Sequence, residues 1–186
     1  MTGGLGSALL RRLANGESFF QKHIEATRGD GDCLLSPTLP GAIQVLDVGE
    51  TRYKITNGAF VAVESGVSLN VRTQNLGRTM FGQTGGFFIC EATGFGKLAA
   101  SGFGSSFVLD VDPGKDIIID NAHVAAWDSA LHHEISMTTQ QSTGFLGQMV
   151  NSVTIKFSGK GKVVICSRSR ENFSTMPSPL VTLFTI

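Results

Sequence analysis

The chain has 186 residues, of which 41% are hydrophobic and only 16% are charged. This charged share is well below the roughly 25% of an average globular chain, which leaves much neutral surface and favours an oligomer or a partner-binding face. Fifteen basic residues balance fifteen acidic ones. The zero net charge excludes the strongly basic surface that is typical of nucleic-acid-binding proteins.

The cysteines, Cys33, Cys90 and Cys166, are odd in number and form no Cys-x-x-Cys pair. This spacing argues against a disulfide framework or a zinc site. Since each lies in a β-type segment, we expect buried free thiols and a reducing compartment. No segment reaches the roughly 20 apolar residues that a membrane-spanning helix needs, and the N-terminus lacks a secretory apolar region.

The first residues carry a helical pattern. The residues that recur at helical spacing are Leu5, Ala8, Leu9, Arg12 and Leu13. Ser7 can cap the start of a helix and Gly16 can end it. We therefore expect one short N-terminal helix whose apolar side packs on the core or on an interface.

After Gly16 the sequence alternates short β-branched and aromatic runs with glycine-rich turns, which is typical of an all-β protein. The segments expected to be strands are Phe19–Ile24, Ala42–Val48, Tyr53–Thr56, Ala59–Val63, Val67–Val71, Gly86–Cys90, Lys97–Ser101, Ser106–Val111, Asp116–Ile119, Val124–Trp127, Val153–Phe157 and Lys162–Ser167. Twenty-three glycines fit the tight turns of stacked β-sandwich or β-helix-like repeats.

Two signatures occur twice. Asn57–Ser65 returns as Asp120–Ser129, with Ala59 and Ala122 63 positions apart, and Glu91–Leu98 returns as Lys156–Val163 at 65 positions. Repetition at this period indicates one supersecondary unit that is copied and stacked.

The repeat predicts a single β domain over residues 1–170. Its internal copies are expected at about 19–71 and 87–136, with a partial copy at 150–167. Residues 171–186 are expected to form a C-terminal tail, either docked on the domain or prone to aggregate.

The chain resembles the AIM24 family (domain of unknown function 124). The motifs that carry the resemblance are Gly3-Gly4, Arg11-Arg12, Gly16–Phe20, Ser36-Pro37, Pro40–Ile43, Asn57–Ala62, Gly94–Gly96, Ala122–Trp127 and Phe157–Val163. The resemblance implies a fold similar to the tryptophan RNA-binding attenuator protein and an oligomer. It further implies mitochondrial inner-membrane organisation in eukaryotes and a soluble, largely uncharacterised protein in bacteria. It implies no catalytic residues.

The resemblance implies further strands before the Gly3-Gly4 segment, at which this chain starts. It also implies an end soon after the final strand, whereas this chain adds Ser169–Ile186. The resemblance therefore implies a truncated or alternatively spliced form. That would affect the first sheet layer and the oligomer.

His123, His132, His133 and Glu134 are the candidate metal ligands, in the manner of a cupin. Adjacent histidines on a strand point to opposite faces, so at most one of His132 and His133 could join His123. Surface or interface histidines are the simpler interpretation.

Other candidate sites have structural interpretations. Gly102–Ser106 lacks the Gly-x-Ser-x-Gly pattern of a nucleophile elbow. Asp120-Asn121 and Asp128 could be an acid and a base, but their counterparts in the first copy are a turn and a strand-end carboxylate. Ser167–Arg170 could contact phosphate, but four residues in a neutral protein are thin support, and a solvated strand end is the better interpretation.

The sequence therefore predicts a non-enzymatic structural or scaffold protein of the AIM24 type that works through self-assembly. We expect a homo-oligomer, peripheral association with the mitochondrial inner membrane or its complexes, no nucleic acid, and no catalytic, metal or cofactor-binding residues. We expect a mitochondrial location in a eukaryote and a cytoplasmic one in a bacterium. The alternatives are a ligand- or RNA-binding module of attenuator-like fold and a cupin-like metalloenzyme that uses His123.

Overall fold

The described part of the chain is built almost entirely from antiparallel strands. The computed structural model describes residues 22–37, 39–56, 58–73, 88–141 and 149–169. Its strands are β1 (Ile43–Val48), β2 (Tyr53–Thr56), β3 (Phe60–Val63), β4 (Val67–Thr73), β5 (Phe88–Gly94), β6 (Gly96–Ser101), β7 (Phe103–Val111), β8 (Ile117–Asp120), β9 (Val124–Asp128), β10 (His132–Gln141), β11 (Met149–Ser158) and β12 (Gly161–Arg168). A 3-10 turn, η1 (Asn121–His123), precedes β9.

The pairing of the strands reveals the same six-stranded unit twice. In the first unit, β6 lies between β1 and β3, and β5 lies between β4 and β2. In the second unit, β12 lies between β7 and β9, and β11 lies between β10 and β8. Even the register shift within β3–β6 recurs within β12–β9. The all-β repeat architecture predicted from the sequence is therefore confirmed.

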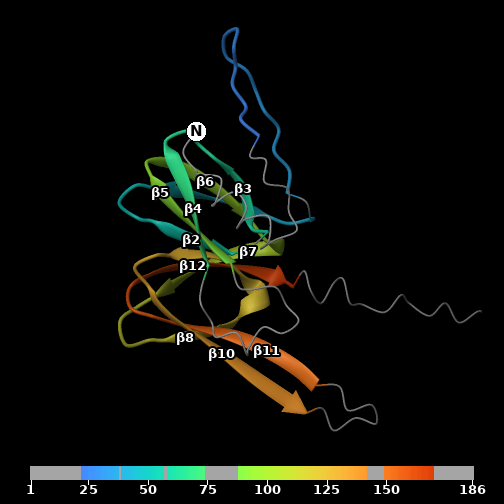
Figure 1. The fold of residues 1–186 in the computed structure, drawn as a ribbon, viewed down its shortest axis with the longest axis vertical. Helices are drawn as coiled ribbons and strands as arrows, with labels where there is room; N and C mark the ends of the chain where they lie inside the picture. The colour runs from blue at the N-terminus through green and yellow to red at the C-terminus, as the bar shows by residue number, and fades with distance from the viewer. Residues whose placement is uncertain (1–21, 38, 57, 74–87, 142–148, 170–186) are drawn as a thin grey trace, which may run out of the picture.

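One strand pair joins the two units. β2 of the first unit pairs with β9 of the second, which produces a six-stranded sheet in the order β4-β5-β2-β9-β12-β7. In Figure 1, β2, β12 and β7 of this sheet cross the middle of the molecule, β4 and β5 lie in the upper part together with β3 and β6, and the β10-β11-β8 sheet lies below. The first unit is thus continuous with the second through backbone hydrogen bonds.

Each unit has its own apolar core. The first core contains Leu46, Ile55 and Leu98, and the second contains Trp127 and Phe157. Ala126 and Val164 lie on β9 and β12 but pack into the first core, so this pair of strands is buried on both faces. That is why the run VAAWD is apolar without alternation until its last residue.

The two cores fill the same position with different residues. Tyr53 lies opposite Ala92 in the first unit, and Ile117 lies opposite Phe157 in the second. A large residue therefore faces a smaller one in both units, but on opposite strands of the pair. The larger side chain lies on one strand of the pair in the first unit and on the other strand in the second. Both cores are therefore filled although the two sequences differ.

The structure corrects several sequence-based expectations. Repeat equivalence by pairing places Tyr53 with Ile117, 64 positions apart, and Val48 with Val111, 63 apart. The second unit therefore has one residue more than the first, and this residue lies in the β7–β8 turn. The pairing also places the boundary between units at Gly102, after β6. The copies expected at about 19–71 and 87–136 belong to the same repeat but begin at another position in it. β10 was not among the expected strands.

Two expectations concern the ends of the chain. The short N-terminal helix and the tail over 171–186 lie outside the described residues. Phe19–Ile24 was expected to be a strand, but residues 22–37 contain no strand in the structure. Figure 1 shows this segment, in blue, projecting away from the sheets. It has no neighbouring strand among the described residues, and a strand without a partner is not stable in water.

Candidate functional site at the junction of the units

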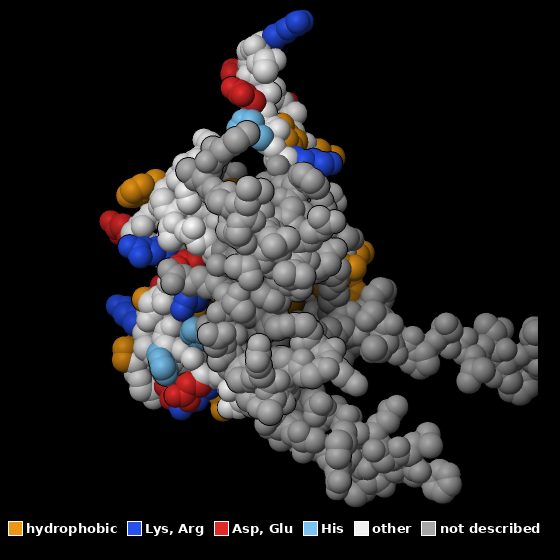
Figure 2. Space-filling model, in the orientation of Figure 1, with side chains coloured by type: hydrophobic (Ala, Val, Ile, Leu, Met, Phe, Trp, Pro, Cys, Tyr) orange, Lys and Arg blue, Asp and Glu red, His pale blue; other side chains and the backbone are white. Residues whose placement is uncertain are grey.

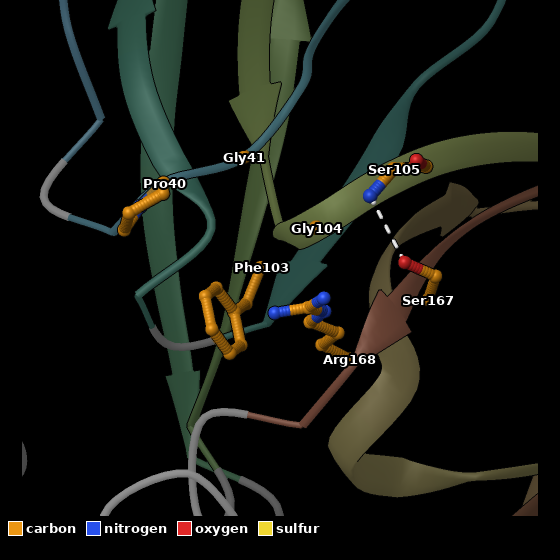
Figure 3. Close-up of a pocket in the computed structure, with 7 residues that line it drawn as sticks. All are labelled: Pro40, Gly41, Phe103, Gly104, Ser105, Ser167 and Arg168. Carbon is orange, nitrogen blue, oxygen red and sulfur yellow. Dashed lines mark hydrogen bonds between the residues drawn. The ribbon is translucent and has the colours of Figure 1, made fainter.

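An open hollow lies where three short segments at the ends of the units meet, and we call these segments the links. Pro40 and Gly41 come from the segment before β1, Phe103–Ser105 from the start of β7, and Ser167 and Arg168 from the end of β12 (Figure 3). These three segments are far apart in the sequence. The strand pairing of β12 with β7 and a parallel bridge between Gly41 and Gly104 bring them together.

The lining residues occupy equivalent positions of the repeat. Pro40 and Phe103 are 63 positions apart, as are Val48 and Val111, and Phe103 and Arg168 are 65 apart, as are Leu98 and Val163. Each lining segment therefore is one copy of the same link. The hollow therefore lies where copies of the same segment meet.

Glycines let the three links approach closely. The Gly104 N–H donates to the Pro40 carbonyl over 3.1 Å, and the Ala42 N–H donates to the Gly104 carbonyl over 2.8 Å. A Cβ on Gly41 would overlap the Gly102 carbonyl oxygen, and a Cβ on Gly102 would overlap the side chain of Cys166. The glycine-rich run Gly102–Ser106 is thus required by packing, in agreement with its structural interpretation.

Arg168 supplies the charge of this hollow. Its guanidinium lies over the Phe103 ring, 5.6 Å from the ring centre, and Figure 3 shows the two side chains facing each other. The Ser105 N–H donates to Ser167 Oγ over 2.9 Å. Among the described residues that line the hollow there is no carboxylate, histidine or lysine. The arrangement can hold an acidic group through Arg168, but it offers no pair of groups for acid–base or nucleophilic catalysis.

The sequence predicted Ser167–Arg170 as a possible phosphate contact but missed the contact of Arg168 with Phe103. The signal was present in the spacing, since the two residues are one repeat apart. Ser169 is buried rather than part of a solvated strand end, and Arg170 lies outside the described residues.

His123 is held by the backbone. Its Nδ1 donates to the Cys166 carbonyl over 2.8 Å, and the Cys166 thiol donates to the His123 carbonyl over 3.3 Å. Since a carbonyl only accepts, this contact places a proton on Nδ1. These two hydrogen bonds hold η1 against β12.

The other candidate metal ligands point elsewhere. His132 is exposed and contacts Glu134 at 3.3 Å, whereas His133 is half-buried against the Trp127 ring, 5.4 Å away. The expectation that these two histidines take opposite faces is confirmed. Burial, and then the nearby charge of Lys54, lower the pKa of His133. Across the described ranges, no three His, Cys, Asp or Glu side chains gather in a way that could hold a metal ion.

The acidic candidates cap turns. Asp120 accepts from the Ala122 N–H at 2.9 Å and caps η1, and Asp128 accepts from the Ala130 N–H at 2.9 Å. In the first unit, Glu64 accepts from the Lys97 N–H at 2.9 Å. The interpretation of these carboxylates as turn and strand-end groups is confirmed.

The cysteines differ in exposure, against the expectation that all three are buried. Cys166 is buried, Cys90 is half-buried and Cys33 is exposed. Cys33 lies in the segment 22–37, which has no sheet around it in the structure. The expectation is therefore wrong for Cys33.

This difference predicts a selective thiol reaction. Burial raises the pKa of Cys166, so little of it is thiolate at neutral pH. With a maleimide at pH 7, we expect Cys33 to react at least about 100-fold faster than Cys166, because the reaction of Cys166 needs local opening. Mass spectrometry of peptides over time measures both rates, and denatured protein serves as the control in which the two rates converge. Equal rates in the native protein would contradict the exposure seen here.

The fold and the junction define the class of the protein: an all-β protein of two fused six-stranded units. A model of the family described as "Mitochondrial biogenesis AIM24" matches residues 1–168. The chain therefore belongs to the AIM24 family, as the motifs in its sequence predict.

Two bacterial proteins are similar to this chain. The uncharacterized protein M6_Spy0233 of Streptococcus pyogenes serotype M6 is 36% identical over 174 residues, which cover 92% of this chain and 68% of the relative. The crystal structure of protein SPYM3_0169 from Streptococcus pyogenes is 33% identical, with a TM-score of 0.61, and covers 75% of this chain and 60% of that one. The chain thus spans about two thirds of the length of these relatives. The likeness to the attenuator protein stays a prediction.

No helix among the described residues is long and apolar enough to cross a membrane.

Proposed function

We propose that this chain is a non-enzymatic scaffold of the AIM24 type, which self-associates and thereby organises a membrane or its complexes. In a eukaryote its site of action is the mitochondrial inner membrane, in keeping with the family's description as mitochondrial biogenesis proteins. In a bacterium it is a cytoplasmic protein. The proposal rests on one observation, an apolar outer strand that occurs in both units.

β1 and β7 are the equivalent outer strands. Each pairs with one strand only among the described residues, β1 with β6 and β7 with β12. Val45 is 53% exposed and its counterpart Val108 is 38% exposed, and Ile43 and Phe107 beside them are exposed as well. We call these two sets of residues the β1 patch and the β7 patch. A free strand edge with apolar side chains favours pairing with another chain.

The repeat gives each chain two such patches. A protein with one self-associating surface forms dimers, whereas a protein with two such surfaces can form larger assemblies. The low charge of the chain reduces the electrostatic repulsion that would oppose this. Along the left side of the molecule in Figure 2, where described residues are visible, basic and acidic side chains lie next to one another.

Lysine at the two valines tests the proposal. We expect the natural chain to show a mass by light scattering that rises with concentration above the 19.7 kDa of one chain. Val45→Lys and Val108→Lys together should return the mass to one chain, because a charge on a strand edge prevents pairing. Either single substitution leaves one patch and should stop assembly at dimers.

Phe95→Lys is the matched control, since Phe95 is an exposed apolar residue at a turn, 78% exposed and outside both patches. It should assemble like the natural chain. A mass of one chain at every concentration, or assembly of the double variant equal to that of the control, would contradict the proposal. Neither an RNA-binding module nor a metalloenzyme is favoured by an observation at the described residues.

A further inference from the structure

Arg168 differs in character from its equivalents in the other two links. The repeat equates it with Phe103, 65 positions earlier, and Phe103 with Pro40, 63 positions earlier. Both of these residues are apolar, so the charge of the hollow comes from the last copy of the position. None of the ion pairs among the described residues includes Arg168. Its charge is therefore available to a ligand.

The start of β7 holds the Arg168 side chain in place. A Cβ on Gly104 would lie 3.1 Å from Arg168 Cγ and 3.3 Å from Cδ, so the glycine leaves room for this stem. The guanidinium lies over the Phe103 ring (Figure 3). Because the N–H groups lie in the plane of the guanidinium, they can still donate to an acceptor in the hollow. A side chain that is already held loses less conformational freedom when a ligand binds.

A crevice adjoins the hollow, since Phe103 and Arg168 line both. Its volume is about 80 Å³. This is several times the roughly 10–15 Å³ that one water molecule needs, so the crevice has room for a few carbon atoms. The apolar side chains along its wall are Leu39, Ala59, Phe103, Ala122, Val124 and Ala125.

The polar side chains of the crevice are largely engaged within the protein. The Thr56 hydroxyl donates to the Val124 carbonyl over 2.8 Å, and the Cys166 thiol donates to the His123 carbonyl. Ser101 also lines the crevice. The wall is therefore mainly apolar, and hydrocarbon is favoured over water in such a space.

A single cation beside an apolar crevice fits a ligand with one negative charge and a short hydrocarbon chain. Among the described residues that line the hollow and the crevice, Arg168 has no second basic residue beside it, which favours a single negative charge. A carboxylate is planar and matches the guanidinium through two parallel hydrogen bonds. Ser167 Oγ accepts from the Ser105 N–H, so its own hydroxyl hydrogen can serve as a further donor.

We propose that the hollow and the crevice together bind a short-chain monocarboxylate, that is, a fatty acid of a few carbon atoms. Its carboxylate pairs with Arg168, and its hydrocarbon chain enters the crevice beside Ala122 and Ala125. Binding is reversible and involves no covalent step. The site shares no residue with the β1 and β7 patches, so it does not depend on the proposed self-association.

Hexanoate is the probe that tests this proposal. An NMR titration follows the amide signals of Ser105, Ala122 and Cys166. We expect hexanoate to bind about tenfold or more tightly than acetate, which lacks the chain, and than hexanol, which lacks the charge. The titration is made with the natural chain and with the double variant Val45→Lys, Val108→Lys, so that ligand binding and self-association are measured independently and either can fail alone.

Three variants locate the binding site. Arg168→Gln should weaken hexanoate binding by about tenfold or more. Arg52→Gln is the matched control, since it removes an exposed arginine that lines neither the hollow nor the crevice, and it should bind like the natural chain. Ala122→Val fills part of the crevice and should weaken the binding of hexanoate but not that of acetate.

Two results would overturn the proposal. One is hexanoate binding that is no tighter than acetate binding in the natural chain, a comparison that stands even where Ala122→Val does not fold. The other is equal hexanoate binding by the Arg168→Gln and Arg52→Gln variants, which would place the ligand elsewhere.

Discussion

Gly41→Ala is expected to destabilise the protein by about 3 kcal/mol, because a new Cβ has no room at the junction. The methyl group would overlap the carbonyl oxygen of Gly102, which is backbone and cannot rotate away. The bridge between Gly41 and Gly104 would have to open, and two hydrogen bonds between the links would be lost with it. Urea unfolding followed by Trp127 fluorescence measures the change.

Gly31→Ala is the control for this prediction. Gly31 lies in the exposed segment 22–37, and its nearest neighbour to a new Cβ would be Ala26 at 3.9 Å. Its free energy of unfolding should stay within about 0.5 kcal/mol of the natural value. Equal stability of the Gly41 and Gly31 variants would show that the links do not meet as described.

Phe157→Ala should cost about 3–5 kcal/mol, as is usual when a fully buried aromatic ring is removed. The ring is 0% exposed and packs edge-on against Trp127, with 5.6 Å between ring centres. Phe95→Ala removes the same side chain from an exposed turn and should have almost no effect. Urea unfolding of the two variants side by side measures both changes.

The equivalence of the units predicts a rescue. Phe157→Ala combined with Ile117→Tyr recreates, in the second unit, the Tyr53–Ala92 pair of the first. We expect the double variant to recover about 1 kcal/mol or more of the lost stability, because the new ring fills part of the cavity. A double variant that is less stable than Phe157→Ala alone would contradict this equivalence.

Local patterns in the sequence were enough to predict most of the fold. Glycine turns at fixed spacing and β-branched runs between them placed the strands, and Tyr53–Thr56 was predicted to the residue. The two repeated signatures predicted the copied unit. These features depend on neighbouring residues, and short-range turn and alternation rules describe them well.

Long-range pairing could not be predicted in the same way. Nothing near β2 in the sequence indicates that its partner is β9, about 70 residues later, and this pair decides where one unit ends and the next begins. For the same reason the contact of Phe103 with Arg168 was missed, although their spacing equals one repeat. Cys33 was expected to be buried because it lies in a β-type segment. It is exposed because burial depends on neighbours that the described chain does not supply.

Our central claim is that the chain contains the same six-stranded unit twice, and that, among the described residues, β8 and β3 are open on the side where their counterparts β2 and β9 pair with each other. Amide hydrogen exchange of the natural chain tests this claim most directly. The claim predicts slow exchange in β2 and β9, which pair with each other, and markedly faster exchange in their counterparts β8 and β3. Equal protection of β2 with β8, and of β9 with β3, would contradict it.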